Sequence, residues 1–93
     1  MDYAVDYRPE VEKEDFPPIP RNLQIRILRA IESRLKTAPT RYGQRLRRSL
    51  SDLWKLRVGD YRVVYEIRGH QVTIWAIRQR KEVYDEAEKR RMH

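Results

Sequence analysis

The sequence contains no cysteine and only two histidines, His70 and His93. Without cysteine no disulfide can form, and the two histidines lie too far apart in the chain to suggest a metal site. We therefore expect a protein that has no disulfide, binds no metal and uses no cofactor.

Long apolar runs are also missing. The opening segment MDYAVDYRPE has neither a basic stretch nor an apolar run, so it does not resemble a signal peptide, and no later segment is apolar enough to span a membrane. No stretch is repetitive or of low complexity. A chain of 93 residues supports one hydrophobic core. We expect a single domain over residues 1–93, located in the cytoplasm and without a membrane partner.

Positive charge is abundant, and it is unevenly distributed. Lysine and arginine total 21 against 14 acidic residues, a formal net charge of +7 and a pI near 10.1. Residues 1–15 hold six acidic and two basic side chains, a net charge of −4, so the rest of the chain carries +11. Such an excess usually indicates a polyanionic partner, nucleic acid before membrane, although a merely solvated basic surface is the alternative.

Periodicity predicts the elements of the first half. Apolar and polar residues alternate over residues 2–7, which predicts a strand. A short acidic helical turn is expected over 10–15, and apolar residues at helical spacing predict a helix over about 20–36, ending before Pro39. The strongly basic segment up to residue 52 shows no clear period and is interpreted as a connection.

The second half predicts a sheet. Strands are expected over 53–58, 61–68 and 71–77, joined by tight turns, and a short helix over 82–91. The predicted fold class is α+β, with a small antiparallel sheet made of the N-terminal strand plus a three-strand meander. This sheet packs on an N-terminal helical hairpin, its helices lie on one face, and a short C-terminal helix closes the chain.

The first tight turn, Gly59-Asp60, sets an unusual register. It places Arg57 directly opposite Arg62, and like charges in that position destabilise a sheet. A solvated outer face is the ordinary explanation of alternating polar residues, but a face of that kind would more often pair opposite charges. Because the guanidinium fork binds phosphate oxygens bidentately, we interpret the pair as a phosphate site.

The same register sorts the remaining strand residues. Trp54 and Tyr65 fall on the face expected to be covered by helices, while Lys55 joins the arginines on the other face. Trp75 is expected opposite Val64 on the arginine face, where its ring could stack on an unpaired base or cover the sheet.

The segment LRRSLSDLWKLRVGDYRVVYEI, followed by IWAIRQRKEVY, is similar to the core signature of the RelE/ParE toxin superfamily, small bacterial proteins of toxin–antitoxin pairs. The likeness covers essentially the whole chain. The RelE branch cuts messenger RNA in the ribosomal decoding site, whereas the ParE branch poisons DNA gyrase, and a shared fold does not choose between them.

The resemblance implies a metal-independent RNA endonuclease with a basic cluster from the sheet and a tyrosine from the last helix. The matching residues here are Lys55, Arg62, Arg80 and Tyr84, and Arg78 competes with Arg80 for the last-strand position. Some relatives carry a further lysine where this chain has Leu53. Relatives also commonly have Gly-His or Gly-Lys where this chain has Arg78-Gln79, which excludes a histidine acid or base at that place.

Cleavage of this kind needs a base on the 2′-hydroxyl, stabilisation of phosphoryl charge and an acid for the leaving oxygen. We expect Tyr84 to be the base, Arg62 the phosphoryl clamp, and Arg80 or Lys55 the acid. Tyr84 could instead only anchor the last helix, and Arg80 could pair with Glu82 or Asp85. The residues expected to bind substrate are Arg57, Arg78, Arg47, Arg48 and Trp75.

The resemblance also implies partners. These are a cognate antitoxin protein, the ribosome with its messenger RNA, and operator DNA that the toxin–antitoxin complex contacts through the antitoxin. Two other functions stay open from the sequence: a ParE-like inhibitor of DNA gyrase on the same fold, and a noncatalytic module that binds nucleic acid.

Overall fold

The structure, a computed structural model, describes residues 2–92, so His93 lies outside the described residues. In chain order the elements are β1 (Ala4–Tyr7), the π-helical turn η1 (Val11–Asp15), α1 (Arg21–Ala30), the π-helical turn η2 (Ile31–Leu35), α2 (Pro39–Tyr42), β2 (Gln44–Arg45), the 3₁₀ turn η3 (Arg48–Leu50), β3 (Leu53–Val58), β4 (Tyr61–Arg68), β5 (Gln71–Gln79) and α3 (Val83–Arg91).

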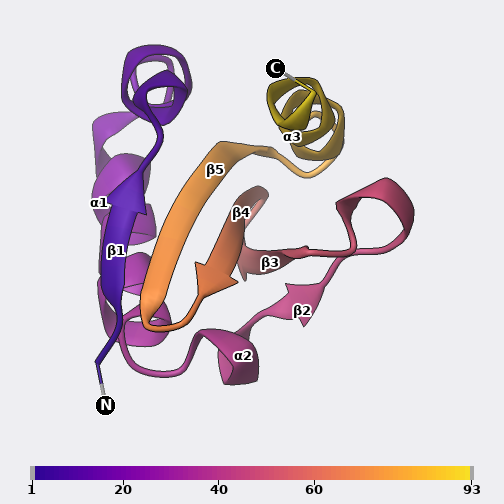
Figure 1. Ribbon diagram of the computed structural model, residues 1–93. Coiled ribbons are helices and arrows are strands. Elements are labelled where there is room, and N and C mark those ends of the chain that lie inside the picture. The colour runs from indigo at the N-terminus through magenta and orange to yellow at the C-terminus, as the bar shows by residue number, and fades with distance from the viewer. Residues whose placement is uncertain (1, 93) are drawn as a thin grey trace.

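The strands form one mixed sheet in the order β1-β5-β4-β3-β2 (Figure 1). Strands β3, β4 and β5 make the antiparallel meander that the sequence predicted, and β1 joins its outer edge parallel to β5. Parallel neighbours need a long connection, and here the chain passes through η1, α1 and η2 and the strands β2 to β4 before β5 returns beside β1. The fifth strand, β2, was missed, because two residues inside a connection leave no readable period.

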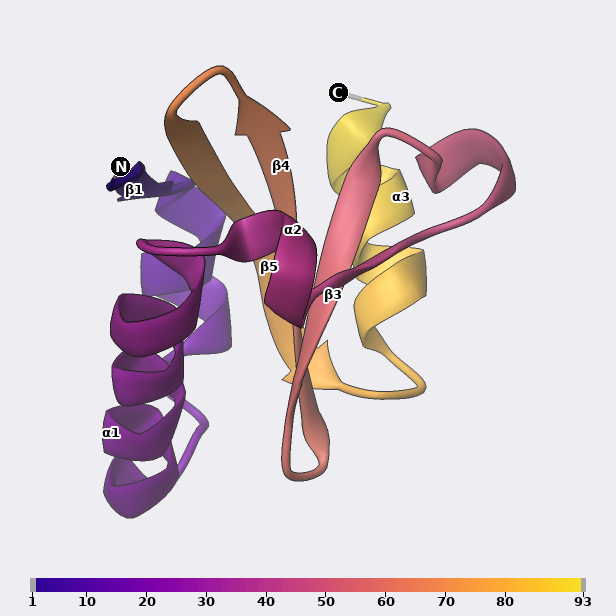
Figure 2. The ribbon, with the colours of Figure 1, turned by 90° about the horizontal axis from the view of Figure 1, so that it is seen from below.

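Helices cover both faces of the sheet. Figure 2 shows α1 on one side of the sheet and α3 on the other. The expectation that the helices lie on one face is therefore wrong. Its physical reason is the uninterrupted run Val63-Val64-Tyr65 in β4, all fully buried, because a strand covered on both faces is apolar on both.

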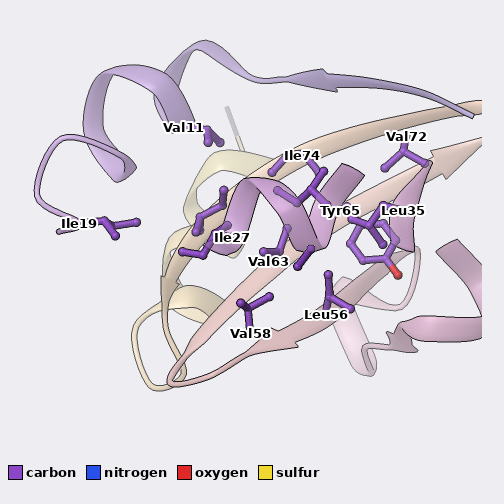
Figure 3. Packing of buried hydrophobic residues seen from close by; sticks show 13 residues of the cluster. Val11, Ile19, Ile27, Leu35, Leu56, Val58, Val63, Tyr65, Val72 and Ile74 are labelled. Atoms are coloured by element: carbon purple, nitrogen blue, oxygen red, sulfur yellow. The ribbon is translucent and has the colours of Figure 1, made fainter. Parts of the chain in front are cut away.

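The first core lies between the sheet and α1 with η2. Ile27 and Leu35 of the helical segment pack with Leu56 and Val63 of the meander (Figure 3), and Ile31 belongs to the same cluster. The predicted register is confirmed here, since Leu56 pairs with Val63, Trp54 with Tyr65 and Val58 with Tyr61.

The second core lies under α3. Val83 and Ala87 of α3 pack on Leu53 and Val64 of the sheet. Leu50 of η3 joins the same cluster and is also buried. The spacing of Val83 and Ala87 places both on the helix face that meets the sheet. This cluster fixes α3 over the face that carries the arginines.

Trp75 lies on the predicted face, the one that α3 covers, but it is not paired with Val64 as predicted. A β-bulge shifts the register between Val64 and Tyr65, so Val64 pairs with Ala76 and Tyr65 with Ile74, and Trp75 faces no partner. An extra residue in one strand re-aims its side chain, and a regular register cannot anticipate it. The indole is buried in the second core, with the guanidinium carbons of Arg8 and Arg91 at 4.1 and 5.1 Å from its ring centroid.

Tyr65 joins the sheet to the segment that follows η2. Its buried hydroxyl donates a 2.6 Å hydrogen bond to the carbonyl oxygen of Pro39, and burial raises the pKa of this phenol, so the hydroxyl stays protonated. Gly43 lies against the same hydroxyl, because a Cβ at this position would stand 1.7 Å from it. Only glycine fits this approach.

We expect Gly43→Ala to lower the free energy of unfolding by about 1–3 kcal/mol, because its methyl group collides with a buried hydroxyl. Tyr65→Phe loses one hydrogen bond, at about 1 kcal/mol. The double variant should lose less than the sum, since deleting the hydroxyl removes the closest collision and leaves only the Tyr65 Cζ atom, 2.8 Å from the added Cβ. Urea denaturation of all four proteins measures this coupling, and strict additivity would show that the two residues do not meet as described.

Candidate functional site

The candidate site is built on the face of the sheet that α3 covers. Arg57 and Arg62 are directly opposite each other, as predicted, and Lys55 lies two residues before Arg57 on the same strand and face. Tyr84 comes from the first turn of α3, and the Lys55 Nζ atom is 5.7 Å from its ring centroid. We call Lys55, Arg57, Arg62 and Tyr84 the basic face.

The side chain of Arg62 is held in place by the turn between β3 and β4. Its exposure is only 9%, and its Nη1 atom donates hydrogen bonds of 3.0 Å to the carbonyl oxygens of both Gly59 and Tyr61. Gly59 adopts φ +60°, which favours glycine in such a turn. Because a guanidinium carries five N–H donors, the donors on Nε and Nη2 remain for another acceptor.

The two competing arginines of the last strand have different surroundings. Arg78 is directly opposite Arg62, but its Nε atom donates to the Asp15 Oδ1 atom at 2.7 Å, and Glu86 lies 3.8 Å from its Nη1 atom. Arg80 is exposed just beyond β5, where its backbone N–H donates to the carbonyl oxygen of Asp60 at 3.2 Å. Within residues 2–92, Arg80 forms no ion pair.

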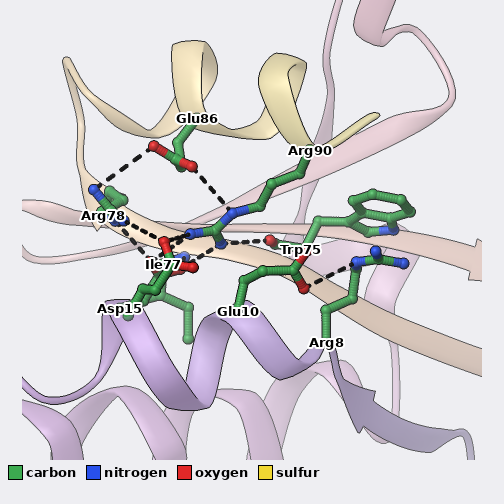
Figure 4. A network of polar contacts seen from close by, with 9 residues as sticks. Arg8, Glu10, Asp15, Trp75, Ile77, Arg78, Glu86 and Arg90 are labelled. Carbon is green, nitrogen blue, oxygen red and sulfur yellow. Dashed lines mark hydrogen bonds and ion pairs between the residues drawn. The ribbon is translucent and has the colours of Figure 1, made fainter. Parts of the chain in front are cut away.

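Figure 4 shows the network that includes Arg78. At its centre is a buried ion pair between Arg90 and Asp15. The Arg90 Nη1 atom lies 2.8 Å from the Asp15 Oδ2 atom, and the Arg90 Nη2 atom lies 2.8 Å from the Asp15 Oδ1 atom. Such a fork-to-fork pair fixes orientation as well as distance. Arg90 belongs to α3 and Asp15 to η1, so this ion pair joins the two ends of the chain.

The same two side chains form hydrogen bonds with backbone groups at the unpaired edge of β5. Strand β1 pairs with β5 only as far as Ile74. Beyond Ile74, β5 still pairs with β4 on one side but has no neighbouring strand on the side of β1. The Asp15 Oδ2 atom accepts the backbone N–H of Ile77 at 2.8 Å, and the Arg90 Nη1 atom donates to the carbonyl oxygen of Trp75 at 2.9 Å. Buried backbone groups without partners are costly, so this replacement of β1 stabilises the strand end.

Burial and hydrogen bonding act in opposite directions on this pair. Burial alone would raise the pKa of Asp15, but hydrogen bonds from Arg90, the Ile77 N–H and Arg78 hold that pKa below its ordinary value. Burial alone would likewise lower the pKa of Arg90, and the hydrogen bond and charge of Asp15 raise it. Both groups are therefore charged in the folded protein at neutral pH.

The basic loop before β3 is anchored to the far end of α3. Arg47 and Arg48 are exposed, and Arg48 has φ +60°, an unusual value for a residue with a side chain. Arg91 forms ion pairs with Asp52 and, at 3.4 Å, with Glu66. These contacts hold the loop beside α3 with its arginines pointing away from the core.

Sequence reasoning missed Asp15 and Arg90. The buried residues of the last helix are Val83, Ala87 and Arg90. Residues at this spacing of four and three lie on one face of a helix. The spacing can be read from the sequence, but it does not indicate that the arginine is buried unless its acidic partner is also known.

Residues 2–92 contain neither a cluster of metal ligands nor a membrane-spanning helix. No group of histidine and acidic side chains there could hold a metal ion. No helix there is both long and apolar enough to cross a membrane.

Comparison with known proteins assigns the chain. Residues 3–84 match the family described as "ParE toxin of type II toxin-antitoxin system, parDE". The chain belongs to this family of toxins, within the RelE/ParE superfamily. No curated protein sequence matches it significantly.

Solved structures share its fold. The toxin–antitoxin complex RelBE2 from Mycobacterium tuberculosis matches with a TM-score of 0.80 and 26% identity, covering 86% of this chain and 100% of that one. A variant of the toxin RelE from Escherichia coli, in the free state, matches with a TM-score of 0.76 and 21% identity, covering 97% of this chain and 98% of that one. The RelB–RelE complex from Methanococcus jannaschii matches with a TM-score of 0.67 and 22% identity, covering 87% of this chain and 96% of that one. The last two identities indicate the fold alone.

We expect Asp15→Asn to lower the free energy of unfolding at pH 7 by up to about 3–5 kcal/mol, because it removes the bidentate counter-ion of the buried Arg90 and leaves Glu86, 3.2 Å from the Arg90 Nε atom, as the nearest carboxylate. The pKa of Asp15 is lowered by folding, so its contribution is present above the unfolded value of about 3.9 and disappears as pH falls through the folded value. The difference between parent and variant should therefore be constant from about pH 7 to 5 and shrink below about pH 4.

Glu14→Gln is the matched control, because Glu14 also approaches Arg90, at 3.7 Å, but its side chain is 57% exposed. An exposed ion pair contributes at most about 1 kcal/mol. Denaturant unfolding at several pH values measures all three proteins. Similar losses for the two variants would contradict the central role given to Asp15.

Proposed function

We propose that this toxin is a ribosome-dependent messenger RNA endonuclease that inhibits translation by 2′-hydroxyl attack on the adjacent phosphate. The observation that carries the proposal is the basic face, where Lys55, Arg57 and Arg62 share the sheet face that α3 covers and Tyr84 of α3 lies beside Lys55. Their positions do not depend on a mobile loop, because the β3–β4 turn holds Arg62 and the second core holds α3.

Each residue has a role that its position allows. Tyr84 is the general base on the 2′-hydroxyl, and the Lys55 ammonium lies over its ring, 5.7 Å from the centroid. Arg62 presents its remaining donors to the phosphoryl oxygens, where charge develops in the transition state. A donor that the turn already orients needs little reorganisation during the reaction. Arg57 positions the substrate from the neighbouring strand.

Arg80 is proposed as the acid for the leaving oxygen, with Lys55 as the other candidate. Arg78 is the weaker choice, because its guanidinium is engaged by Asp15 and lies near Glu14 and Glu86. A guanidinium held by carboxylates has fewer donors for a substrate and meets their negative charge as well. We therefore assign Arg78 to the network that positions α3.

Trp75 is not proposed to stack on a base, because its ring is buried beneath α3. Arg47 and Arg48 are exposed on the loop beside α3 and are proposed to bind the backbone of RNA.

As a type II toxin, the protein has a cognate antitoxin as its partner, and we propose that this antitoxin silences it through the basic face. Two of the similar structures are complexes with RelB antitoxins. An acidic or amphipathic helix would shield Arg57 and Arg62 while covering apolar surface. Operator DNA would be contacted through the antitoxin.

The family description favours one other function, inhibition of DNA gyrase, because ParE toxins name the matched family. A gyrase inhibitor needs no assembled acid and base, so the arrangement of Lys55, Arg62 and Tyr84 favours the nuclease. Primer extension on cellular transcripts after brief induction distinguishes the two. Discrete cuts inside translated regions support the nuclease, whereas intact transcripts together with DNA breaks support gyrase inhibition.

Arg62→Ala should lower the single-turnover cleavage rate on programmed ribosomes by about 10²–10³, with little change in ribosome affinity, because the lost interaction forms mainly in the transition state. Arg62→Lys keeps the charge without the planar fork and should recover only part of the rate. Thermal unfolding of each variant reports whether the turn survives. A folded Arg62→Ala protein with parental cleavage would remove Arg62 from the mechanism.

Tyr84→Phe keeps the ring and its packing but deletes the ionisable oxygen. If Tyr84 is the base, the rate should fall by about 10²–10⁴ while stability changes little. If Tyr84 only anchors α3 by the packing of its ring on the second core, Tyr84→Phe keeps that packing, and both cleavage and stability stay near the parent values. Single-turnover cleavage measured beside thermal unfolding separates the two, and the second result would move the base role to Lys55.

A further inference from the structure

A second basic feature lies on the other side of β3, away from α3. An open groove of about 570 Å³ runs between α1 with η2 and the end of β3. Arginine dominates its lining, with Arg26, Arg29, Arg34 and Arg57 around it. We call this hollow the arginine groove. Among the described residues, no aspartate or glutamate lines it.

Within residues 2–92, none of these four guanidinium groups forms an ion pair, whereas Arg78, Arg90 and Arg91 each lie beside carboxylates. Arg26 and Arg29 are three residues apart on α1, so their like charges lie on one face of the helix and repel each other. An anion bound between the arginines would relieve this repulsion.

The arginine groove is closed at one end by a close approach. A Cβ at Gly59 would lie 3.4 Å from the Arg26 Nη1 atom, so the Arg26 side chain reaches from α1 to the β3–β4 turn. The groove therefore has a defined wall on the turn side, beside the residues that hold Arg62.

Arg57 belongs both to the basic face and to the arginine groove. Strand β2 pairs with β3 only at Trp54 and Lys55, so the residues after Lys55 form the outer edge of the sheet. A long side chain on an unpaired edge strand can reach ligands on either face of the sheet. The two basic surfaces are thus continuous across the edge of β3.

We propose that the arginine groove binds the sugar–phosphate backbone of single-stranded RNA that continues from the basic face across Arg57. Guanidinium forks bind phosphate oxygens bidentately. An acidic peptide fits less well, because peptide recognition needs apolar anchors, and the groove offers only Ala30 and Val58. The exposed apolar residues of α1, Ile25 and Leu28, lie outside it. The choice of RNA rests on the proposed function.

The test is a triple variant, Arg26→Gln with Arg29→Gln and Arg34→Gln, which leaves Arg57 in place. The probe is a fluorescent oligouridylate of about 12 nucleotides, and anisotropy gives its affinity between about 50 and 200 mM salt. Each phosphate contact on a single strand contributes about 0.7 to the slope of log affinity against log salt. We expect the variant's slope to be shallower than the parent's by about 2.

The matched control removes three exposed charges elsewhere, Lys13→Gln with Arg21→Gln and Arg68→Gln, and so has the same net charge as the groove variant. Its slope should change by less than about 0.7, because it loses no phosphate contact. Equal slope changes in the two variants would overturn the proposal, since only net charge would then matter. Thermal unfolding confirms that both variants fold.

A labelled oligoglutamate peptide tests the alternative occupant. If the parent binds the peptide as tightly as the RNA, and the groove variant loses both equally, the groove is an acidic-peptide site and the proposal is overturned. Failure here is distinct from failure of the proposed function, because binding is measured without ribosomes. A parent that cuts transcripts but shows no groove-dependent slope contradicts the groove alone. A parent that shows the slope but cuts nothing contradicts only the nuclease.

Discussion

The buried ion pair between Asp15 and Arg90 is the constraint on which the candidate site depends. It fills the place beside β5 that β1 leaves empty, and it holds α3 against the sheet through one orientation of a planar fork. Buried ion pairs contribute little net stability, but they specify geometry, because a misplaced partner leaves a charge unpaired in the interior. Tyr84 stands above Lys55 because α3 is fixed at this angle.

The arginines of this small protein divide into two groups. Arg78, Arg90 and Arg91 are neutralised by carboxylates and hold segments together. Arg26, Arg29, Arg34 and Arg57, around the end of β3, form no ion pair within residues 2–92 and line an open groove. Positive charge without a counter-ion is therefore gathered where a polyanion could bind, whereas Asp15 of the acidic first segment neutralises Arg78 and Arg90.

The sequence was informative wherever local chemistry decides structure. The Gly59-Asp60 turn fixed the register, so the opposition of Arg57 and Arg62 was predictable from a dozen residues. Nonlocal features were not predictable in this way. The bulge beside Trp75, the parallel position of β1 and the partnership of Asp15 with Arg90 all depend on residues far apart in the chain. The role of Tyr84 came from family resemblance, and the structure supplied its proximity to Lys55.

The short reach of β2 leaves the last residues of β3 without a neighbouring strand. A bare strand edge is a template on which a second copy could add, and natural proteins guard such edges with charge. Two copies meeting here would bring Arg57 of each chain together, along with the arginines of α1, so repulsion opposes sheet-to-sheet growth. The side chains proposed to bind RNA would thus also protect the free toxin from self-association through this edge.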